Sequence, residues 1–200
     1  MRSDNNQLLH KPNTAPYGLS IAQWTAKWWQ WILSLPDEHS PVIDTTGEKA
    51  AVSQIGPVWF LAGTIGGIVE RRCVIPEEKS ILLPILNHGG TLADSKNSKT
   101  VQELQLFAKK EMDVISDIHA MIDNKELTDL HQYRITTPIF DVSLPKNNLF
   151  SGTPGPTKGC SDGYWLFLLP FKKGTHRIQT LGSCLSGKIR IGVNYEIISI

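Results

Sequence analysis

The most regular hydrophobic pattern of the chain lies between residues 20 and 34, which hold four of the six tryptophans. Ser20 and Gln23 have the spacing of a helix capping box, and Pro36 ends the pattern. Apolar residues recur every three or four positions and share one arc of about 100° on a helix: Ile21, Trp24, Trp28, Trp31, Ile32 and Leu35. The sequence therefore predicts an amphipathic helix whose tryptophan stripe packs against a large apolar partner.

Two apolar side chains of this predicted helix, Trp29 and Leu33, project well away from the main stripe. Apolar surface then covers more than half of the helix circumference, and we expect a second partner to cover that face. Aromatic residues at helical spacing usually belong to a core, which is the simplest interpretation of the cluster. The alternative places Trp29 and Leu33 in a subunit interface, or Trp29 in a ligand pocket, where such aromatic residues are enriched.

Beyond residue 54 the pattern changes to short apolar runs between turn residues, which is typical of β-strands. Residues 58–62 form one such run. Residues 72–75 and 80–86 flank a short polar turn, and we expect them to pair as a hairpin. Pro84 cannot donate a hydrogen bond to a neighbouring strand, so it predicts either a sheet edge or a bulge at that position.

The second half of the chain combines one helix with further strands. Thr100 and Glu103 form a second capping box, which opens a predicted helix near residues 100–113. Apolar or alternating runs predict strands over residues 114–122, 139–144, 163–169, 175–181 and 188–198, and a long loop over residues 145–162.

These elements indicate a mainly β fold with α additions. We expect a β-sandwich, of the jelly-roll or immunoglobulin-like kind, packed with the tryptophan-rich helix and the second helix. Residues 1–17 are polar and contain two prolines, so they predict a flexible N-terminal arm. Residues 18–200 are of a suitable length for a single sandwich domain with helical insertions.

The composition of the chain argues against some classes of binding partner. The 20 basic and 19 acidic side chains nearly balance, and no basic patch that would bind nucleic acid is evident. No apolar run approaches the roughly 18 residues of a membrane span, so we expect a soluble protein. The first residues lack the apolar segment of a secretion leader, and the three cysteines have no metal-ligand spacing. These features predict a cytoplasmic protein with unpaired cysteines.

The order of several motifs resembles that of an uncharacterised family of microbial proteins, many of which look secreted. The resemblance runs from about residue 17 to the C-terminus and rests on WTAKWWQW (24–31), DTTG (44–47), QIGPVWFLAG (54–63), RCVIP (72–76), DGYW (162–165), Pro170 and GTH (174–176). It implies no activity. Relatives often carry a cysteine just before the QxGPVW segment, which would suit a disulfide to the cysteine of the RCVIP segment. Residues 49–52 are Lys-Ala-Ala-Val here, so the resemblance implies that Cys73 lacks that partner.

Catalytic and cofactor motifs are absent from the sequence. It contains no phosphate-binding loop, no Gly-x-Ser-x-Gly turn and no His-Glu-x-x-His helix motif. The glycine cluster at residues 63–67 lacks dinucleotide-binding spacing and predicts a plain turn between strands. The histidines are scattered, so the sequence predicts neither a metal site nor a cofactor.

Six residues are candidates for a ligand pocket, because together they would form an apolar cleft with a few polar groups. They are Trp59, Arg72, Asp162, Tyr164, Trp165 and His176. Such a cleft would suit a sugar or a small aromatic molecule. The alternative role of the charged residues is structural, with Arg72 or Arg134 paired to Asp44 or Asp162.

Three classes of function remain. The tryptophan excess favours a non-enzymatic protein that binds a small molecule or a carbohydrate on a β-sandwich. The two apolar faces of the predicted helix favour a self-associating protein, a homo-oligomer that buries Trp29 in a symmetric contact. An enzyme is the least favoured class, since it would need an acid and a base drawn from Asp44, Asp162, His88 and His176.

Overall fold

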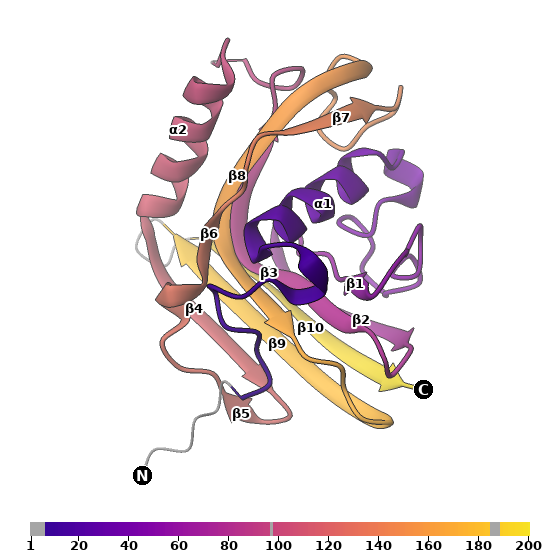
Figure 1. Ribbon diagram of the computed structural model, residues 1–200. Coiled ribbons are helices and arrows are strands. Elements are labelled where there is room, and N and C mark those ends of the chain that lie inside the picture. The colour runs from indigo at the N-terminus through magenta and orange to yellow at the C-terminus, as the bar shows by residue number, and fades with distance from the viewer. Residues whose placement is uncertain (1–6, 97, 185–188) are drawn as a thin grey trace.

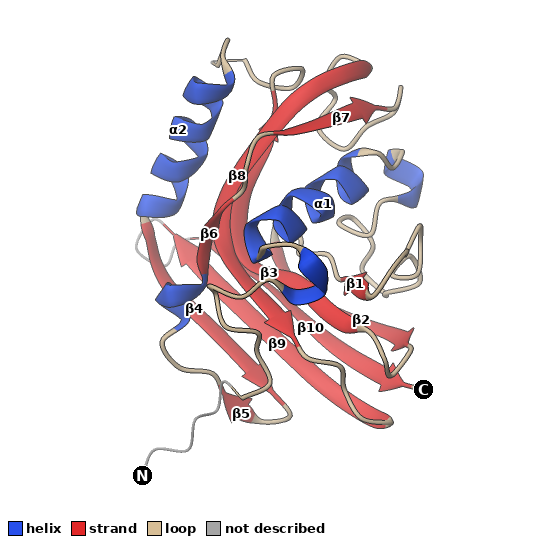
Figure 2. Ribbon diagram, in the orientation of Figure 1, coloured by secondary structure: helices blue, strands red, loops and turns tan. Residues whose placement is uncertain are grey.

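Two mixed β-sheets face each other in the computed structural model, which describes residues 7–96, 98–184 and 189–200. The first sheet contains β1 (Val58–Phe60), β3 (Ser80–Thr91), β8 (Gly155–Leu168), β6 (Arg134–Thr136) and β7 (Phe140–Leu144). The second contains β2 (Gly67–Ile75), β10 (Ile189–Ser199), β9 (Gly174–Cys184), β4 (Ile115–Ile122) and β5 (Lys125–Glu126). Figure 2 shows the strands as two curved layers accompanied by helices. The predicted mainly β fold with helical additions is confirmed.

The sheets differ from the predicted hairpin arrangement. β2 and β3 are consecutive in sequence but belong to different sheets, so the predicted pairing of residues 72–75 with residues 80–86 is wrong. β2 pairs in parallel with β10, at the other end of the chain, and β1 pairs in parallel with β3. The remaining pairs are antiparallel. A partner so far away in sequence leaves no local signal from which its pairing could be predicted.

The proline in β3 marks a bulge, which is one of the two predicted outcomes. The register between β3 and β8 shifts between Pro84 and Leu86. β1 reaches only as far as Leu82, where its pairing with β3 ends. Beyond that point no strand in the described part of the chain pairs with β3 on the β1 side. The bulge therefore lies at an open stretch of an otherwise central strand.

Side chains from both sheets fill the space between them, as expected for a sandwich. Leu83 of β3 and Leu166 of β8 meet Ile178 of β9 and Ile197 of β10 in one continuous apolar core. Each is fully or almost fully buried. This core accounts for the cohesion of the two layers, because apolar burial contributes about 25 cal/mol for each Å² removed from water.

The tryptophan-rich helix α1 (Ile21–Leu33) covers the outer face of the first sheet (Figure 1). Its capping box forms as predicted, with Ser20 and Gln23 each accepting from the other's backbone N–H. Trp28 stacks edge-to-face on Trp165 of β8, with ring centroids 5.2 Å apart. The predicted stripe is therefore core, and the face that carries Trp29 is buried as well.

The second helix, α2 (Val101–Asp113), also forms with the predicted capping box, made by Thr100 and Glu103. It buries Leu104, Ala108 and Met112. Figure 1 shows α1 and α2 on opposite sides of β8. The described residues also contain three short 3-10 helices: η1 (Pro16–Gly18), η2 (Asp37–His39) and η3 (Leu130–Tyr133).

Two predicted irregular regions are more ordered than expected. β8 begins at Gly155, so the predicted loop over residues 145–162 is about half strand. Within the predicted N-terminal arm, Leu9 forms a β-bridge to Leu168, and the His10 N–H donates to the Phe167 carbonyl at 2.8 Å. Residues 1–6 of the predicted arm lie outside the described residues.

Candidate functional site

A cavity of about 240 Å³ lies beside the open edge of β3. Helix α1, the loop after β1, the bulged part of β3 and strands β9 and β10 enclose it. Most of its wall is apolar, including Ile32, Ile85, Leu149, Phe150 and Val193. Among the described residues that line it there is no Lys, Arg, Asp or Glu. The cavity therefore offers a neutral, mainly hydrocarbon environment.

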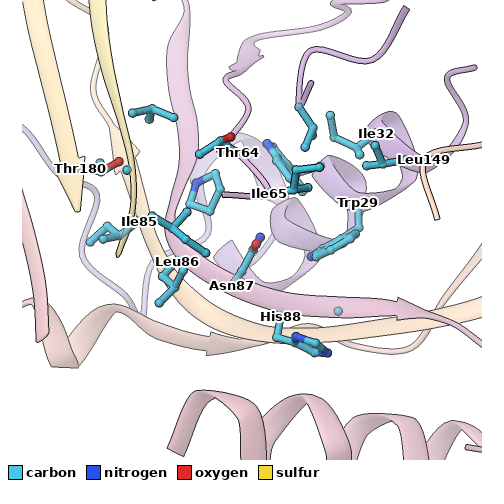
Figure 3. A pocket seen from close by; sticks show the side chains of 18 of the residues that line it. Trp29, Ile32, Thr64, Ile65, Ile85, Leu86, Asn87, His88, Leu149 and Thr180 are labelled. Carbon is cyan, nitrogen blue, oxygen red and sulfur yellow. The ribbon is translucent and has the colours of Figure 1, made fainter. Parts of the chain in front are cut away.

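Three buried polar atoms, each on a residue that lines the cavity, have no hydrogen-bond partner among the described residues. They are Trp29 Nε1, Asn87 Nδ2 and Thr180 Oγ1. Figure 3 shows the Trp29 and Asn87 side chains in the same part of the pocket, with Thr180 on another wall. Other buried polar atoms also lack partners, among them the indole nitrogens of Trp59 and Trp165, but these two side chains do not line the cavity. Three of the seven unpaired side-chain atoms of the described residues therefore belong to residues that line this cavity.

Asn87 faces the cavity because of the bulge. Before it, Leu83 and Ile85 point to the core between the sheets. Leu86 also points that way, since a Cβ added at Gly182 of β9 would lie 2.8 Å from its Cδ2. One extra residue on a strand reverses the alternation that follows, so Asn87 and Gly89 turn toward α1. Without the bulge the Asn87 amide would point into the apolar inter-sheet core.

His88, the next residue, points away from the cavity toward α2 (Figure 3). Its ring meets Phe107 edge-to-face at 5.2 Å. Burial lowers the pKa of His88, and the negative charges of Glu111 and Asp94 only partly oppose that effect. His88 is therefore neutral near pH 7 and adds no cation to the cavity.

The solvent side of the cavity is bordered by two apolar side chains from separate loops. Ile65 is 65% exposed and lies between the glycines at 63 and 66–67, and Phe150 is 37% exposed. The Phe150 ring lies 6.3 Å from the Trp29 ring. The cavity thus meets the surface beside Ile65 and Phe150, with Trp29 behind them.

Arg71, which sequence reasoning missed, holds two walls of this cavity in place. Its guanidinium is only 3% exposed and donates to the backbone carbonyls of Val42, Asp44, Ala62 and Gly63 and to the Tyr195 hydroxyl. Val42 and Gly63 both line the cavity. The strand alternation of β2 would have identified it, because the neighbouring Arg72 points to solvent.

Asp44 fixes a turn in the loop that contains Val42, which lines the cavity. Its carboxylate accepts hydrogen bonds from the backbone N–H groups of Thr46, Gly47 and Lys49 at 2.8–3.0 Å. Burial acts to raise the pKa of Asp44, but these hydrogen bonds together outweigh it and the pKa is lowered. The carboxylate is therefore a structural acceptor that fixes the turn.

The structure does not bring the six predicted pocket residues together. Tyr164 packs into the inter-sheet core and Trp165 into the α1 layer, because consecutive strand residues point to opposite faces. Trp59 also belongs to the inter-sheet core. Trp59 and Tyr164 lie on one side of the first sheet and Trp165 on the other, so the structure does not bring these three side chains together in one cleft.

The three polar members of that set lie in separate ion pairs. The Arg72 side chain is 68% exposed and pairs with Glu196 at 3.1 Å. Asp162 is buried and accepts from Arg134 Nε at 2.6 Å, which is the structural pairing considered from the sequence. His176 Nδ1 lies 2.7 Å from a carboxylate oxygen of Asp123.

Trp29 and Leu33, the predicted interface residues, are 4% and 1% exposed within this single chain. The chain itself covers the second face of α1, so neither side chain presents a surface to a second copy. Of the two alternatives for Trp29, the geometry favours the pocket wall.

Nucleophile and metal chemistry find little support in the described residues. Burial raises the pKa of Cys73 to about 12 and that of Cys160 to about 11, so both thiols are protonated at neutral pH. The side chain of Cys184 lies outside the described residues. No group of three or more His, Cys, Asp or Glu side chains suited to a metal ion gathers in the part of the chain described.

Comparison with known proteins yields no match to the chain among protein-family models, curated proteins or solved structures. None of the helices in the described ranges is long and apolar enough to cross a membrane.

Proposed function

We propose that the protein is a non-enzymatic binding protein that holds a small molecule in the cavity between α1 and β3. The observation that carries the proposal is one apolar cavity whose lining residues carry three buried polar atoms without a partner, namely Trp29 Nε1, Asn87 Nδ2 and Thr180 Oγ1. A buried polar group without a partner costs about 1–3 kcal/mol. A ligand that supplies the partners removes that cost on binding and adds apolar contact.

The character of the wall supports binding rather than catalysis. A general acid or base needs a titratable group within hydrogen-bond reach of the reacting atoms. Among the described residues that line the cavity, the only ionisable side chain is that of His88, which burial keeps neutral by lowering its pKa and which faces α2. The wall instead provides fixed dipoles and hydrocarbon, which orient a molecule without activating it.

A screen of small neutral fragments tests the proposal, with saturation-transfer NMR and thermal shift as readouts. Thr64 lines the cavity beside Ile65, so Thr64→Phe should fill the cavity and abolish binding. Leu106→Phe is the matched control, because Leu106 is 54% exposed on α2 and does not line the cavity. Saturable binding in wild type and Leu106→Phe but not in Thr64→Phe is expected. Fragments that bind all three proteins equally, or none, would contradict the proposal.

A further inference from the structure

We infer that the ligand of this cavity is an uncharged cyclic or aromatic molecule that presents a carbonyl oxygen to Trp29 Nε1 and Asn87 Nδ2. The inference rests on the proposed function, and it specifies the chemistry that the cavity selects. Four properties of the cavity carry it: the direction of its hydrogen bonds, its charge, its volume and the distribution of its polar groups.

The direction of the hydrogen bonds comes from Trp29. An indole N–H can only donate, and so can an amide –NH₂ group, so the missing partner must be an acceptor. The other three indoles of α1, Trp24, Trp28 and Trp31, each donate to a backbone carbonyl at 2.8 Å. The Trp29 indole, in the same helix, lacks such a carbonyl among the described residues. An oxygen of the ligand would take the place that a backbone carbonyl occupies for its neighbours.

The charge of the ligand follows from the wall. A carboxylate or phosphate placed here would lose its hydration without meeting a Lys or Arg side chain, at a cost of several kcal/mol. The nearby cation, Arg71, already donates to four carbonyls and one hydroxyl. An ammonium group is disfavoured as well, because no Asp or Glu is found among the described residues that line the cavity. A neutral acceptor satisfies the site without an uncompensated charge.

The volume and the polar pattern set the size of the molecule. A protein cavity of about 150 Å³ takes benzene, whereas drug-sized ligands need about 300 Å³ or more. The 240 Å³ here suits one ring with a short substituent. Ile85, Leu149 and Val193 provide the apolar contact for the ring. Thr180 Oγ1 can donate or accept, so it tolerates a second polar group at the other end.

The experiment is a titration of uniformly ¹⁵N-labelled protein with acetophenone, followed through the assigned indole N–H resonances. Ethylbenzene, which lacks the carbonyl, and benzoate, which is charged, are the matched probes. We expect acetophenone to move the Trp29 resonance downfield and to leave the resonances of Trp24 and Trp31, which do not line the cavity, nearly unchanged. We expect it to bind at least about fivefold more tightly than ethylbenzene, as the gain of one or two hydrogen bonds implies.

A variant pair tests the role of the amide. Asn87→Leu should reduce the preference for acetophenone over ethylbenzene, whereas Asn194→Leu, on β10 outside the cavity, should preserve it. Ethylbenzene binding as tightly as acetophenone, with no downfield shift at Trp29, would overturn the inference and leave the proposed function standing. Tighter binding of benzoate in the cavity would overturn it too. Failure of acetophenone and ethylbenzene alike to bind would defeat both the inference and the proposed function.

Discussion

The indole of Trp29 lies directly over the backbone of Gly89: a Cβ built on Gly89 would come within 2.8 Å of Trp29 Cζ2. The same Cβ would lie 2.4 Å from the Cβ of Ser161 on β8. Only a glycine therefore allows the helix and the strand to approach this closely. That approach places the Trp29 N–H at the wall of the cavity.

Substitution of this glycine should displace the tryptophan. We expect Gly89→Ala to lower the free energy of unfolding by about 1–3 kcal/mol, since neither the β8 backbone nor the indole can yield freely. Gly66→Ala is the control, because an added Cβ there meets no atom within 4 Å, and its effect should stay within about 0.5 kcal/mol. Urea unfolding measures both values. Equal effects of the two substitutions would refute the close approach of Trp29 and β3.

Removal of an unpaired hydroxyl should not destabilise the ligand-free protein. Thr180→Val keeps the shape of the side chain and deletes a buried oxygen that lacks a partner, so its stability should equal or exceed that of wild type. Thr137 is the matched control: its buried hydroxyl donates to the Ser161 carbonyl and accepts from the Ser161 N–H. Thr137→Val should lose about 1–3 kcal/mol. A comparable loss in Thr180→Val would mean that its hydroxyl is already paired.

Substitutions of the two adjacent arginines of β2 should have very different effects on the free energy of unfolding. Arg71→Met leaves the carbonyls of Val42, Asp44 and Gly63 without their donor and should cost about 3 kcal/mol or more. Arg72→Met removes one exposed ion pair and should cost less than about 1 kcal/mol. Thermal and urea denaturation compare them. Similar losses would contradict the assignment of Arg71 as the anchor of the cavity walls.

The turn held by Asp44 should make stability sensitive to acid. Because the pKa of Asp44 is lowered on folding, its stabilisation is present above the ordinary carboxyl pKa near 4 and is lost as the pH falls through the lower folded value. Asp44→Asn should therefore be less stable than wild type at pH 7. Its stability should also fall less steeply below pH 4. Urea titrations at several pH values test this, and parallel pH profiles of the two proteins would speak against it.

Local patterns were enough to predict the helices and most strands, but not the site. The capping boxes and helical spacing of α1 and α2 are signals within a few residues, and both helices form where predicted. Pro84 likewise predicted a sheet edge or a bulge, and the bulge forms there. The partner of β2 lies at the opposite end of the chain, so no short-range pattern predicts its sheet.

The cavity was missed for a related reason. The strand predicted from the sequence ends at residue 86, whereas β3 continues to Thr91, and the register shift between Pro84 and Leu86 reverses the direction of every later side chain. Asn87 lies beyond the predicted strand, so its direction could not be predicted from the proline alone. The contribution of Thr180 could not be predicted either, because β9 reaches the cavity only through the packing of one sheet on the other.

A crystal structure of the protein soaked in acetophenone tests the central claim most directly. The account predicts density for one ring between α1 and β3, with its carbonyl oxygen about 2.7–3.2 Å from Trp29 Nε1. It further predicts that Asn87 Nδ2 contacts the same oxygen. Ordered water paired to Trp29, Asn87 and Thr180, with no probe in the cavity at saturating concentration, would contradict it.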